Sequence, residues 1–343
     1  MDLNGLLPAV SIVMTAHNSA AAVQEAVLSL AAQTLENIEI IAVDDASTDA
    51  TPDILRETAS RDPRMRVLAM PRNSGAFAAA NAGLLIARAP LVARMDSDDV
   101  SMPHRLAAQK RFMDAHPDCI LLSSGFHEID ETGRVLRTVH RPRDAFQTAW
   151  IGRFHYPLRH PATMFRRLGP DGAPLRYSEA ARASMDYEFY ARARRLGDVV
   201  SLPEPLLSYR IHDKSITATR RRQQLSVAST ISLSIQAELP APVQEALAPF
   251  NAAFLFCKPR RPRHLFAAMR SIVRHDAAAH PARRAWMMRQ SCALLLMAMS
   301  RIGMPRHEML RAFGMHGADF LPSLAGKAFE TSSARLRARP ASP

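Results

Sequence analysis

Apolar and polar positions alternate between two periods over the first hundred residues of the chain. Short apolar runs of five or six residues, typical of buried strands, are followed by stretches with helical spacing. The predicted strands are Val10–Met14, Ile38–Val43, Met65–Ala69 and Leu91–Met95, and the predicted helices are Ser19–Gln33, Thr51–Ser60 and Gly75–Arg88. Ser19 is placed to cap the first of these helices. This βαβαβαβ order predicts a doubly wound α/β unit around a parallel sheet.

The pattern changes after a helix that we expect from Pro103 to about His116. Ile120–Ser124 and Val135–Val139 flank a turn at Thr132-Gly133, so they predict a β-hairpin in a mixed part of the sheet. The remaining elements are strand candidates at Thr163–Arg166, Val199–Leu202 and Leu206–His212 and a helix over Asp186–Leu196. We therefore place the end of the first domain at about residue 215.

From residue 216 onward the chain is rich in alanine, arginine and methionine with helical spacing. Prolines interrupt this spacing at positions 240, 242, 249, 259, 262, 281 and 305, and a proline inside a helix normally ends or kinks it. The pattern predicts an all-α appendage of short helices over residues 216–330. Residues 331–343 have too few apolar side chains to be held against a core, so we expect a frayed tail.

The 343 residues include 44 Lys and Arg against 32 Asp and Glu, a net charge of +12. Residues 1–215 contain 25 basic and 26 acidic residues, whereas residues 216–343 contain 19 basic and 6 acidic residues. The basic excess therefore belongs to the helical region and suggests contact with an anionic membrane surface. The alternatives are a solvated appendage, a dimerisation element, or binding to nucleic acid, which the scarcity of interleaved aromatic residues makes unlikely.

The number and spacing of the cysteines and the lengths of the apolar runs indicate the cellular compartment in which the protein is found. The three cysteines lie far apart without a C-x-x-C pair, which fits a reducing compartment and no zinc site. The first residues lack the positive segment of a secretory signal. The apolar run Cys292–Met299 is far shorter than the roughly 20 residues that span a bilayer. We expect a cytoplasmic protein, with the inner face of the cell membrane as the surface that its basic region contacts.

Polar clusters directly follow the four predicted strands. These clusters are Thr15 to Asn18, Asp44 to Asp49, Asn73 to Gly75 and Asp96 to Asp99. Open α/β sheets bind ligands at the carboxyl ends of their strands, so four such clusters together predict a binding site there. One cluster alone would be explained by helix capping. Neither the glycine fingerprint of a dinucleotide fold nor a P-loop is present.

Carboxylates dominate this predicted edge. Asp96 and Asp98 can together hold one hard divalent cation that also binds diphosphate oxygens. Asp44 or Asp45 can accept hydrogen bonds from the edge of a nucleotide base.

Several sequence blocks resemble, in their order and spacing, the family 2 glycosyltransferases of the GT-A fold. The blocks are Val10–Met14 with Asn18, Val43–Asp49, Asn73 with Gly75 and Asn81, and Met95–Asp99. The resemblance covers about residues 8 to 215. It implies a GT-A catalytic domain over 1–215, with a donor-binding half over about 1–103 and an acceptor half over about 104–215. It also implies sugar transfer from a nucleotide-diphosphate sugar, usually UDP-linked, with inversion and with Mg2+ or Mn2+.

The resemblance assigns roles on the donor side by position. It implies that Thr15 and Asp45 contact the base, that Asp96 lies near the ribose and donor sugar, and that Asp98 holds the metal. The family's usual aromatic position after the first strand is absent, so His17 would be the stacking ring. The full set of implied donor-binding residues is Thr15, His17, Asn18, Asp44, Asp45, Asn73, Gly75 and Asp96.

On the acceptor side, Ser184–Tyr190 resembles the family's Glu-Asp-Tyr block, and Asp186 falls at the position of its general base. The alternative for Asp186 is an acid favoured at a helix N-terminus by the helix dipole. Tyr209–His212 resembles the closing Tyr-Arg-x-His segment, which implies His212 as a metal or diphosphate ligand. Arg210 or Lys214 would offset the leaving-group charge, and His160 would line the acceptor pocket.

The resemblance favours addition of a single sugar, because the Gln-x-x-Arg-Trp motif of processive members is absent. We expect a saccharide or lipid-linked acceptor, as in bacterial cell-surface polysaccharide assembly. The alternative is a non-catalytic nucleotide-sugar-binding domain or a nucleotidyltransferase. A nucleotidyltransferase would need a basic, glycine-rich loop after the first strand, and Thr15 to Asn18 is not one.

Overall fold

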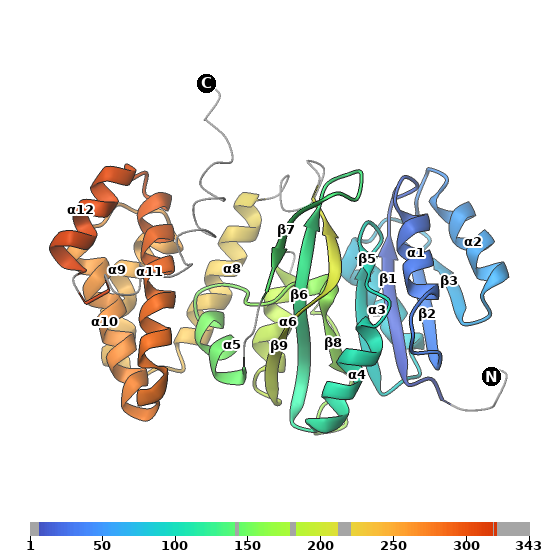
Figure 1. The fold of residues 1–343 in the computed structure, drawn as a ribbon, viewed down its shortest axis with the longest axis horizontal. Helices are drawn as coiled ribbons and strands as arrows, with labels where there is room; N and C mark the ends of the chain where they lie inside the picture. Colours follow the sequence, from blue (N-terminus) through green and yellow to red (C-terminus); the bar gives the residue numbers. More distant parts are fainter. Residues whose placement is uncertain (1–6, 141–143, 179–182, 212–220, 318, 321–343) are drawn as a thin grey trace. The chain divides into compact units, whose positions relative to one another are not determined.

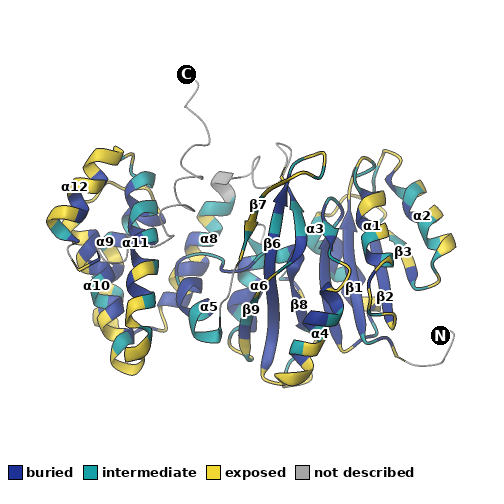
Figure 2. Ribbon diagram, in the orientation of Figure 1, coloured by how far each residue is buried: buried dark blue, intermediate teal, exposed yellow. Residues whose placement is uncertain are grey.

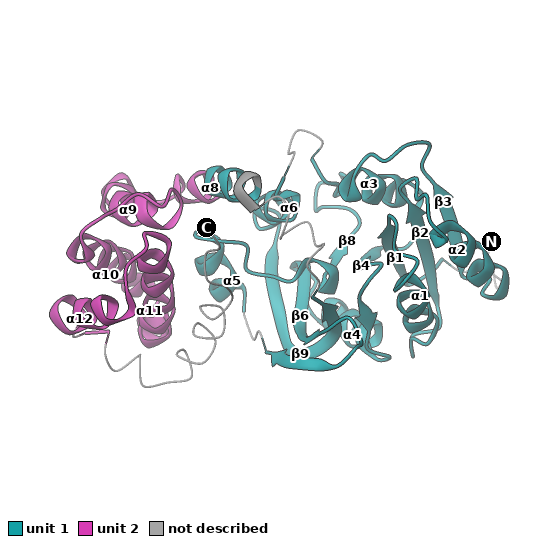
Figure 3. Cartoon of the chain, turned by 90° about the horizontal axis from the view of Figure 1, so that it is seen from above, with its two compact units in different colours: residues 1–231 teal, residues 232–343 magenta. Residues whose placement is uncertain are grey.

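A computed structural model describes residues 7–140, 144–178, 183–211, 221–317 and 319–320 (Figure 1). The chain divides into two compact units, Met1–Ile231 and Ser232–Pro343, which we describe separately (Figure 3). The division lies inside a helix, whereas the sequence-based boundary at 215/216 lies outside the described residues, as does the tail 331–343.

The first unit contains four parallel strands in the order β3-β2-β1-β4. These are β1 (Val10–Ala16), β2 (Ile38–Asp44), β3 (Met65–Ala69) and β4 (Leu91–Asp96). Every residue of β1 and β2 is buried, which explains why both strands appear as continuous apolar runs rather than alternating ones (Figure 2). The four predicted strands are confirmed.

The same sheet continues from β4 through β8, β6, β9 and β5, and β7 pairs with β6. Their bounds are β5 (Val100–Ser101), β6 (Cys119–Ile129), β7 (Val135–Val139), β8 (Met164–Arg166) and β9 (Asp198–Arg210). β8 is antiparallel to both β4 and β6, whereas β9 is parallel to β6. The predicted hairpin is therefore β6-β7, and this half of the sheet is mixed.

Strand β9 is continuous where the sequence pattern predicts two strands separated by prolines. The pairing register with β6 shifts on both sides of Gly125, which lies opposite Pro205. A Cβ at Gly125 would come within 2.7 Å of the Pro203 carbonyl oxygen, so only glycine allows this close approach. Because a bulge accommodates residues that cannot donate to the ladder, the two prolines do not end the strand.

Helices cover both faces of the sheet, as a doubly wound unit requires. They are α1 (Val23–Ala31), α2 (Thr51–Arg61), α3 (Ala76–Ile86), α4 (Arg105–Ala115), α5 (Ala145–Gly152) and α6 (Met185–Ala193). Helices α3 and α6 lie on one face, and α1 and α4 lie on the other (Figure 3). Helix α3 packs closely on the sheet, because a Cβ at Gly83 would come within 2.7 Å of Val13 Cγ1.

The predicted cap of the first helix is wrong. Helix α1 begins at Val23, and its N-cap residue Ala22 makes no side-chain capping bond. Ser19 contributes backbone groups instead: its N–H donates to Thr51 Oγ1 and its carbonyl accepts from the Val23 N–H. The loop before the helix is therefore tied to the start of α2, which local sequence preferences do not reveal.

The second unit is helical among its described residues. Helix α8 (Arg221–Gln236) enters it, followed by α9 (Ala241–Phe254), α10 (Pro262–Ala279), α11 (Arg284–Arg301) and α12 (Arg306–His316). The predicted all-α appendage is confirmed, but the helices are longer than expected, with 18 residues in α10 and in α11. Pro249 lies inside α9, whereas Pro242 and Pro262 lie in first turns, where a missing N–H removes no helical bond. Within the described ranges, no helix is long and apolar enough to cross a membrane.

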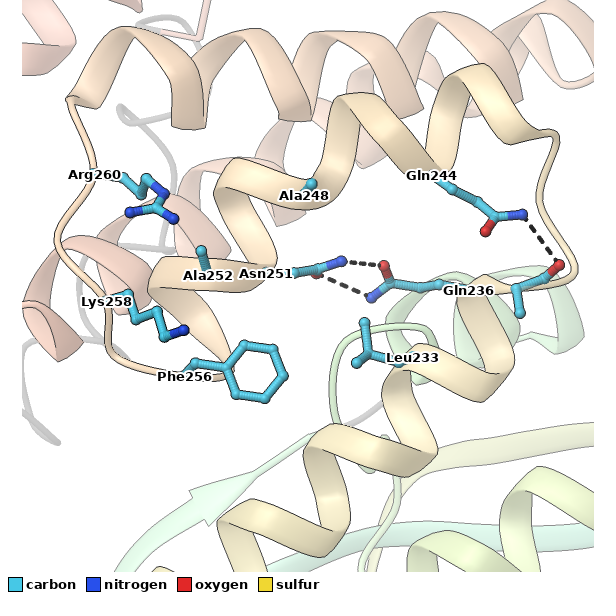
Figure 4. A pocket seen from close by; sticks show the side chains of 10 residues that line it. Leu233, Gln236, Gln244, Ala248, Asn251, Ala252, Phe256, Lys258 and Arg260 are labelled. Carbon is cyan, nitrogen blue, oxygen red and sulfur yellow. Dashed lines mark hydrogen bonds between the residues drawn. The ribbon is translucent and has the colours of Figure 1, made fainter.

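A cavity of about 300 Å³ lies beside α8 and α9 in this unit (Figure 4). At its wall Asn251 Nδ2 donates to Gln236 Oε1 over 2.7 Å, and both amides are buried. Phe256, Lys258 and Arg260 also line it. The amide pair satisfies two polar groups that burial would otherwise leave without partners, and so it joins the two helices.

Candidate active site

The strand register brings three of the predicted polar clusters to one edge of the sheet. Ala16 at the end of β1 pairs with Asp44 of β2, and Thr15 pairs with Asp96 of β4. The segments that follow these strands therefore start side by side. The structure thus brings together the clusters that sequence spacing alone could only align in order.

Asp45 ties the loop after β2 to the start of α3. Its two carboxylate oxygens accept the backbone N–H groups of Ser74, over 2.8 Å, and of Gly75, over 2.7 Å. The Gly75 φ of +90° lies in the left-handed region, which favours glycine at this position. Asp44 plays a related part within its own loop, because its Oδ1 accepts the Ser47 N–H. The structure therefore gives both predicted base-side acids a loop-building contact.

His17, Asn18 and Asn73 form one hydrogen-bonded group. The His17 Nδ1 lies 2.8 Å from the Asp45 carbonyl oxygen, which can only accept, so Nδ1 carries the proton. The His17 Nε2 then accepts from Asn73 Nδ2 over 2.8 Å. Asn18 Oδ1 accepts the Thr48 N–H over 2.8 Å. These bonds connect the loops after β1, β2 and β3 and fix the orientation of the imidazole at the edge.

Arg94 is a buried cation that sequence reasoning missed. It lies on β4 with only 1% of its surface exposed, and its Nη1 donates to the Val13 carbonyl oxygen over 2.6 Å. Its Nη2 lies 3.3 Å from Thr15 Oγ1 and 3.4 Å from Asp96 Oδ1. A buried guanidinium requires nearby acceptors, so a lone arginine within the apolar run Leu91–Met95 is a signal for a charged site next to it.

Four carboxylates form what we call the carboxylate cluster: Asp96, Asp98, Asp99 and Asp186. Burial raises the pKa of Asp96 to about 6; Arg94 opposes this rise, and the negative charges of Asp98 and Asp186 add to it. Burial, together with the charges of Asp98 and Asp96, also raises the pKa of Asp99 well above its usual value. Asp186 is about 90 residues away in the sequence, yet its charge acts on Asp96 at the end of β4.

The carboxylate cluster suits a divalent cation by its chemistry. Asp99 Oδ1 accepts the Arg210 N–H, whereas Asp99 Oδ2 is buried without a hydrogen-bond partner. Although its surroundings remove enough water to raise its pKa, Asp96 keeps 38% of its side chain exposed, so a ligand can reach it. In the part of the chain that is described, no group of three or more His, Cys, Asp or Glu is arranged as a metal site. Mg2+ and Mn2+ often take one or two carboxylates plus phosphate oxygens, which this arrangement allows.

Helix α6 holds Asp186 in its first turn. The Asp186 Oδ1 accepts the Tyr187 N–H over 2.9 Å, as an acid at a helix start does. The helix is anchored because the buried Tyr187 hydroxyl donates to the Gly152 carbonyl oxygen and the Tyr190 hydroxyl donates to Thr148 O. Burial raises the pKa of Asp186 above its usual value. Both sequence-based interpretations of this residue are thus compatible with its position.

His160 lies near the same acids, at the start of a short 3-10 helix over His160–Ala162. Its Nε2 is 3.0 Å from the Tyr177 hydroxyl, and Tyr156 reaches its Nδ1 over 3.4 Å. Burial lowers the pKa of His160 well below its usual value, so the ring is neutral at physiological pH. Asp96 and Asp186 both act on the pKa of Tyr177, which places the His160–Tyr177 pair beside the carboxylate cluster.

Arg210 is engaged in holding loops. Its guanidinium donates to the carbonyl oxygens of Asp98, Asp130 and Glu131 and pairs with Glu25 over 2.5 Å. Contact with a leaving group would therefore require some of these bonds to break. The other two candidates on this segment, His212 and Lys214, lie outside the described residues.

Comparison with known proteins identifies the class to which this fold and site belong. Residues 11–169 match the family model described as Glycosyl transferase family 2. The succinoglycan biosynthesis protein ExoO of Rhizobium meliloti (strain 1021) is 30% identical over 223 residues, which cover 62% of this chain and 63% of that protein. An uncharacterized glycosyltransferase of Methanocaldococcus jannaschii, MJ1057, is 29% identical, with 63% of this chain and 76% of that protein covered.

Solved structures support the same class at the level of the fold. TarS 1–349 from S. aureus in complex with UDP-GlcNAc gives a TM-score of 0.58 at 18% identity, with 85% of this chain and 88% of that chain covered. The mannosyltransferase PcManGT from Pyrobaculum calidifontis, in complex with GDP-Man and Mn2+, gives 0.55 at 19% identity over 92% and 88%. The protein is a glycosyltransferase with a GT-A-type fold. Residues 11–169, a little under half of the chain, are similar to glycosyltransferase family 2.

Proposed function

We propose that this protein transfers a single sugar, with inversion and with a divalent metal, from a nucleotide-diphosphate sugar to a saccharide or lipid-linked acceptor. The observation that carries the proposal is that Asp186 at the start of α6 and Asp96 at the end of β4 lie near enough for their charges to interact. An inverting transfer needs a carboxylate on the acceptor side opposite the charged groups that bind the departing diphosphate. Relatives named for succinoglycan biosynthesis support polysaccharide assembly as the context.

We assign the donor side to the ends of β1, β2, β3 and β4 and the loops that follow them. Thr15 and Asp45 would contact the base, a UDP base being the first choice, with His17, Asn18, Asp44, Asn73 and Gly75 shaping its site. Asp96 would face the ribose and donor sugar, and Asp98 would hold Mg2+ or Mn2+. A bound metal would neutralise negative charge on the diphosphate. The similarly folded mannosyltransferase PcManGT, whose structure is a complex with GDP-Man and Mn2+, supports this assignment.

We assign proton transfer to Asp186. In the proposed step the acceptor hydroxyl oxygen attacks the anomeric carbon from the face opposite the diphosphate, and Asp186 takes the hydroxyl proton. The raised pKa of Asp186 suits this role, because a general base works best with a pKa near the operating pH. His160 would line the acceptor side, where its neutral ring can donate one hydrogen bond and accept another but carries no charge.

A thermal-shift panel of nucleotide sugars, with and without Mn2+, tests the proposal. Binding at about 100 times Kd adds about 2.7 kcal/mol to the free energy of unfolding. We therefore expect one UDP- or GDP-linked sugar to raise the melting temperature clearly with Mn2+ and much less without it. A panel in which no nucleotide sugar stabilises the protein under either condition would contradict the proposal.

We further propose that the basic region beyond residue 215 contacts the anionic inner face of the cell membrane, so that a cytoplasmic catalytic domain meets a lipid-linked acceptor. Each cation near such a surface contributes about 1 kcal/mol of attraction. We expect the full-length protein to float with liposomes that contain anionic lipid and to remain in solution with neutral ones. Equal behaviour with both lipid compositions would exclude this attachment.

A further inference from the structure

Arg159 is a cation at the site that no motif of the sequence indicates. It directly precedes the 3-10 helix His160–Ala162. Its guanidinium carbon lies 4.4 Å from the ring centre of Phe126 on β6 and 4.2 Å from that of Tyr209 on β9. The two rings meet at 77°, so the guanidinium occupies the corner between them. Cation–π contacts with two rings hold the charge in one place.

The Arg159 guanidinium has no hydrogen-bonding partner among the described residues. Its Nε is buried without a partner, and none of the ion pairs within the described ranges includes it. One of its two rings, Tyr209, directly precedes Arg210, whose backbone N–H donates to Asp99 Oδ1 over 2.9 Å, so the guanidinium lies close to the carboxylate cluster. The positive charge of Arg159 also opposes the rise that burial causes in the pKa of Asp186. A partly buried cation with unused donors, held by two rings, is arranged to bind an anionic ligand.

The other cations near these acids are already engaged. Arg94 donates to Val13 O and reaches Thr15 and Asp96. Arg210 donates to three carbonyl oxygens and pairs with Glu25. The Nε of Arg94 is also buried without a partner, but its two terminal nitrogens are engaged. Of these three arginines, only Arg159 has terminal nitrogens that make no hydrogen bond among the described residues, so it can take up a new anion without losing an existing bond.

We propose that Arg159 binds the diphosphate of the nucleotide-sugar donor and stabilises it as the leaving group. This inference rests on the proposed function. During transfer the bond between the anomeric carbon and the phosphate oxygen breaks, and its electron pair stays on that oxygen while the acceptor oxygen bonds to the carbon. The planar guanidinium fork matches phosphate oxygens with two parallel hydrogen bonds, which a lysine cannot reproduce.

Calorimetric titration of the full-length protein with Mn2+ and UDP, UMP or uridine tests this inference, with the GDP series as the alternative base. Arg159→Met should weaken diphosphate binding by about 10- to 100-fold, which corresponds to one charge-assisted contact. Nucleoside binding should stay unchanged, so the ratio of diphosphate to monophosphate affinity should fall. Arg159→Lys should restore part of that ratio, and Arg56→Met, on the exposed face of α2, should leave it unchanged.

The outcomes separate the inference from the proposal on which it rests. If the wild-type protein binds neither UDP nor GDP with Mn2+, both fail. If it binds one of them and Arg159→Met keeps the wild-type ratio, only the inference is overturned. If the ratio of diphosphate to monophosphate affinity is unchanged but the KM for the acceptor is raised, Arg159 binds an anionic group of the acceptor instead, which also overturns the inference. Loss of uridine and UDP binding in equal measure would indicate a purely structural role and would also overturn it.

Discussion

Replacing Asp98 with alanine is expected to lower the transfer rate by about 100-fold or more, because a metal supplies several kcal/mol of charge stabilisation in such reactions. The same variant should lose the part of nucleotide-diphosphate affinity that depends on Mn2+, because the diphosphate then lacks its metal bridge. Titration of UDP with and without Mn2+, alongside initial rates, measures both effects.

The matched control for this variant is Asp53→Ala. Asp53 is an exposed acid in the first turn of α2, paired with Arg56 and remote from the carboxylate cluster in the sheet order. The Asp53→Ala substitution removes one negative charge from the same unit, as Asp98→Ala does, but leaves the carboxylate cluster unchanged. An Asp98→Ala enzyme whose rate and Mn2+ dependence match those of Asp53→Ala would refute the assignment of Asp98.

Replacing Asp186 with asparagine is expected to lower the transfer rate by about 10²- to 10⁴-fold, the usual contribution of a general base. Nucleotide affinity should persist, since Asp186 faces the acceptor in the proposed reaction. In the wild-type protein the rate should rise with pH as Asp186 loses its proton, and the raised pKa moves this rise above the range of an ordinary aspartate. An asparagine variant with wild-type turnover would exclude Asp186 as the base.

The raised pKa of Asp186 also predicts how the Asp186→Asn substitution changes the stability of the protein. A carboxyl with a folded-state pKa above its unfolded value stabilises the fold fully below the unfolded pKa and loses that contribution as pH rises through the folded pKa. Asparagine cannot ionise, so Asp186→Asn should melt at a higher temperature than the wild type at pH 7, and the difference should shrink at pH 4. A lower melting temperature at pH 7 would contradict the cost of burying this charge.

Local patterns were sufficient to predict the strands of the donor half. The predicted Met65–Ala69 coincides with β3, and β4 extends the prediction Leu91–Met95 by one residue. Strands β1, β2 and β4 are buried along almost their whole length, and such strands contain mostly apolar side chains, so their extent is visible without knowledge of their neighbours. The edge strand β3 is only partly buried, and its short apolar run lies between polar residues. The positions of Asp45 and Asp96 at strand ends follow from the same pattern.

Local rules failed where distant contacts replaced them. Pro203 lies inside β9 because Gly125 on β6 leaves room for its carbonyl, and Ser19 is held by Thr51 rather than capping α1. Pro249 lies within α9, where tertiary packing outweighs the loss of one helical hydrogen bond. In each case the contact that stabilises the observed structure comes from residues far away in the sequence, which local propensities do not take into account.

The sequence by itself determined the order of the first four strands and their helices along the chain, the polar clusters at the strand ends and the similarity to glycosyltransferase family 2. These features depend on residues near one another in the chain. Only the tertiary structure decided that the charges of Asp186 and Asp96 interact, that Arg210 is bound to loop carbonyls, and that Arg159 lies between two rings with unused donors. Such charges interact through space across β4, α6 and the segment before His160, and the free energy of a buried charge depends on its surroundings rather than on its sequence neighbours.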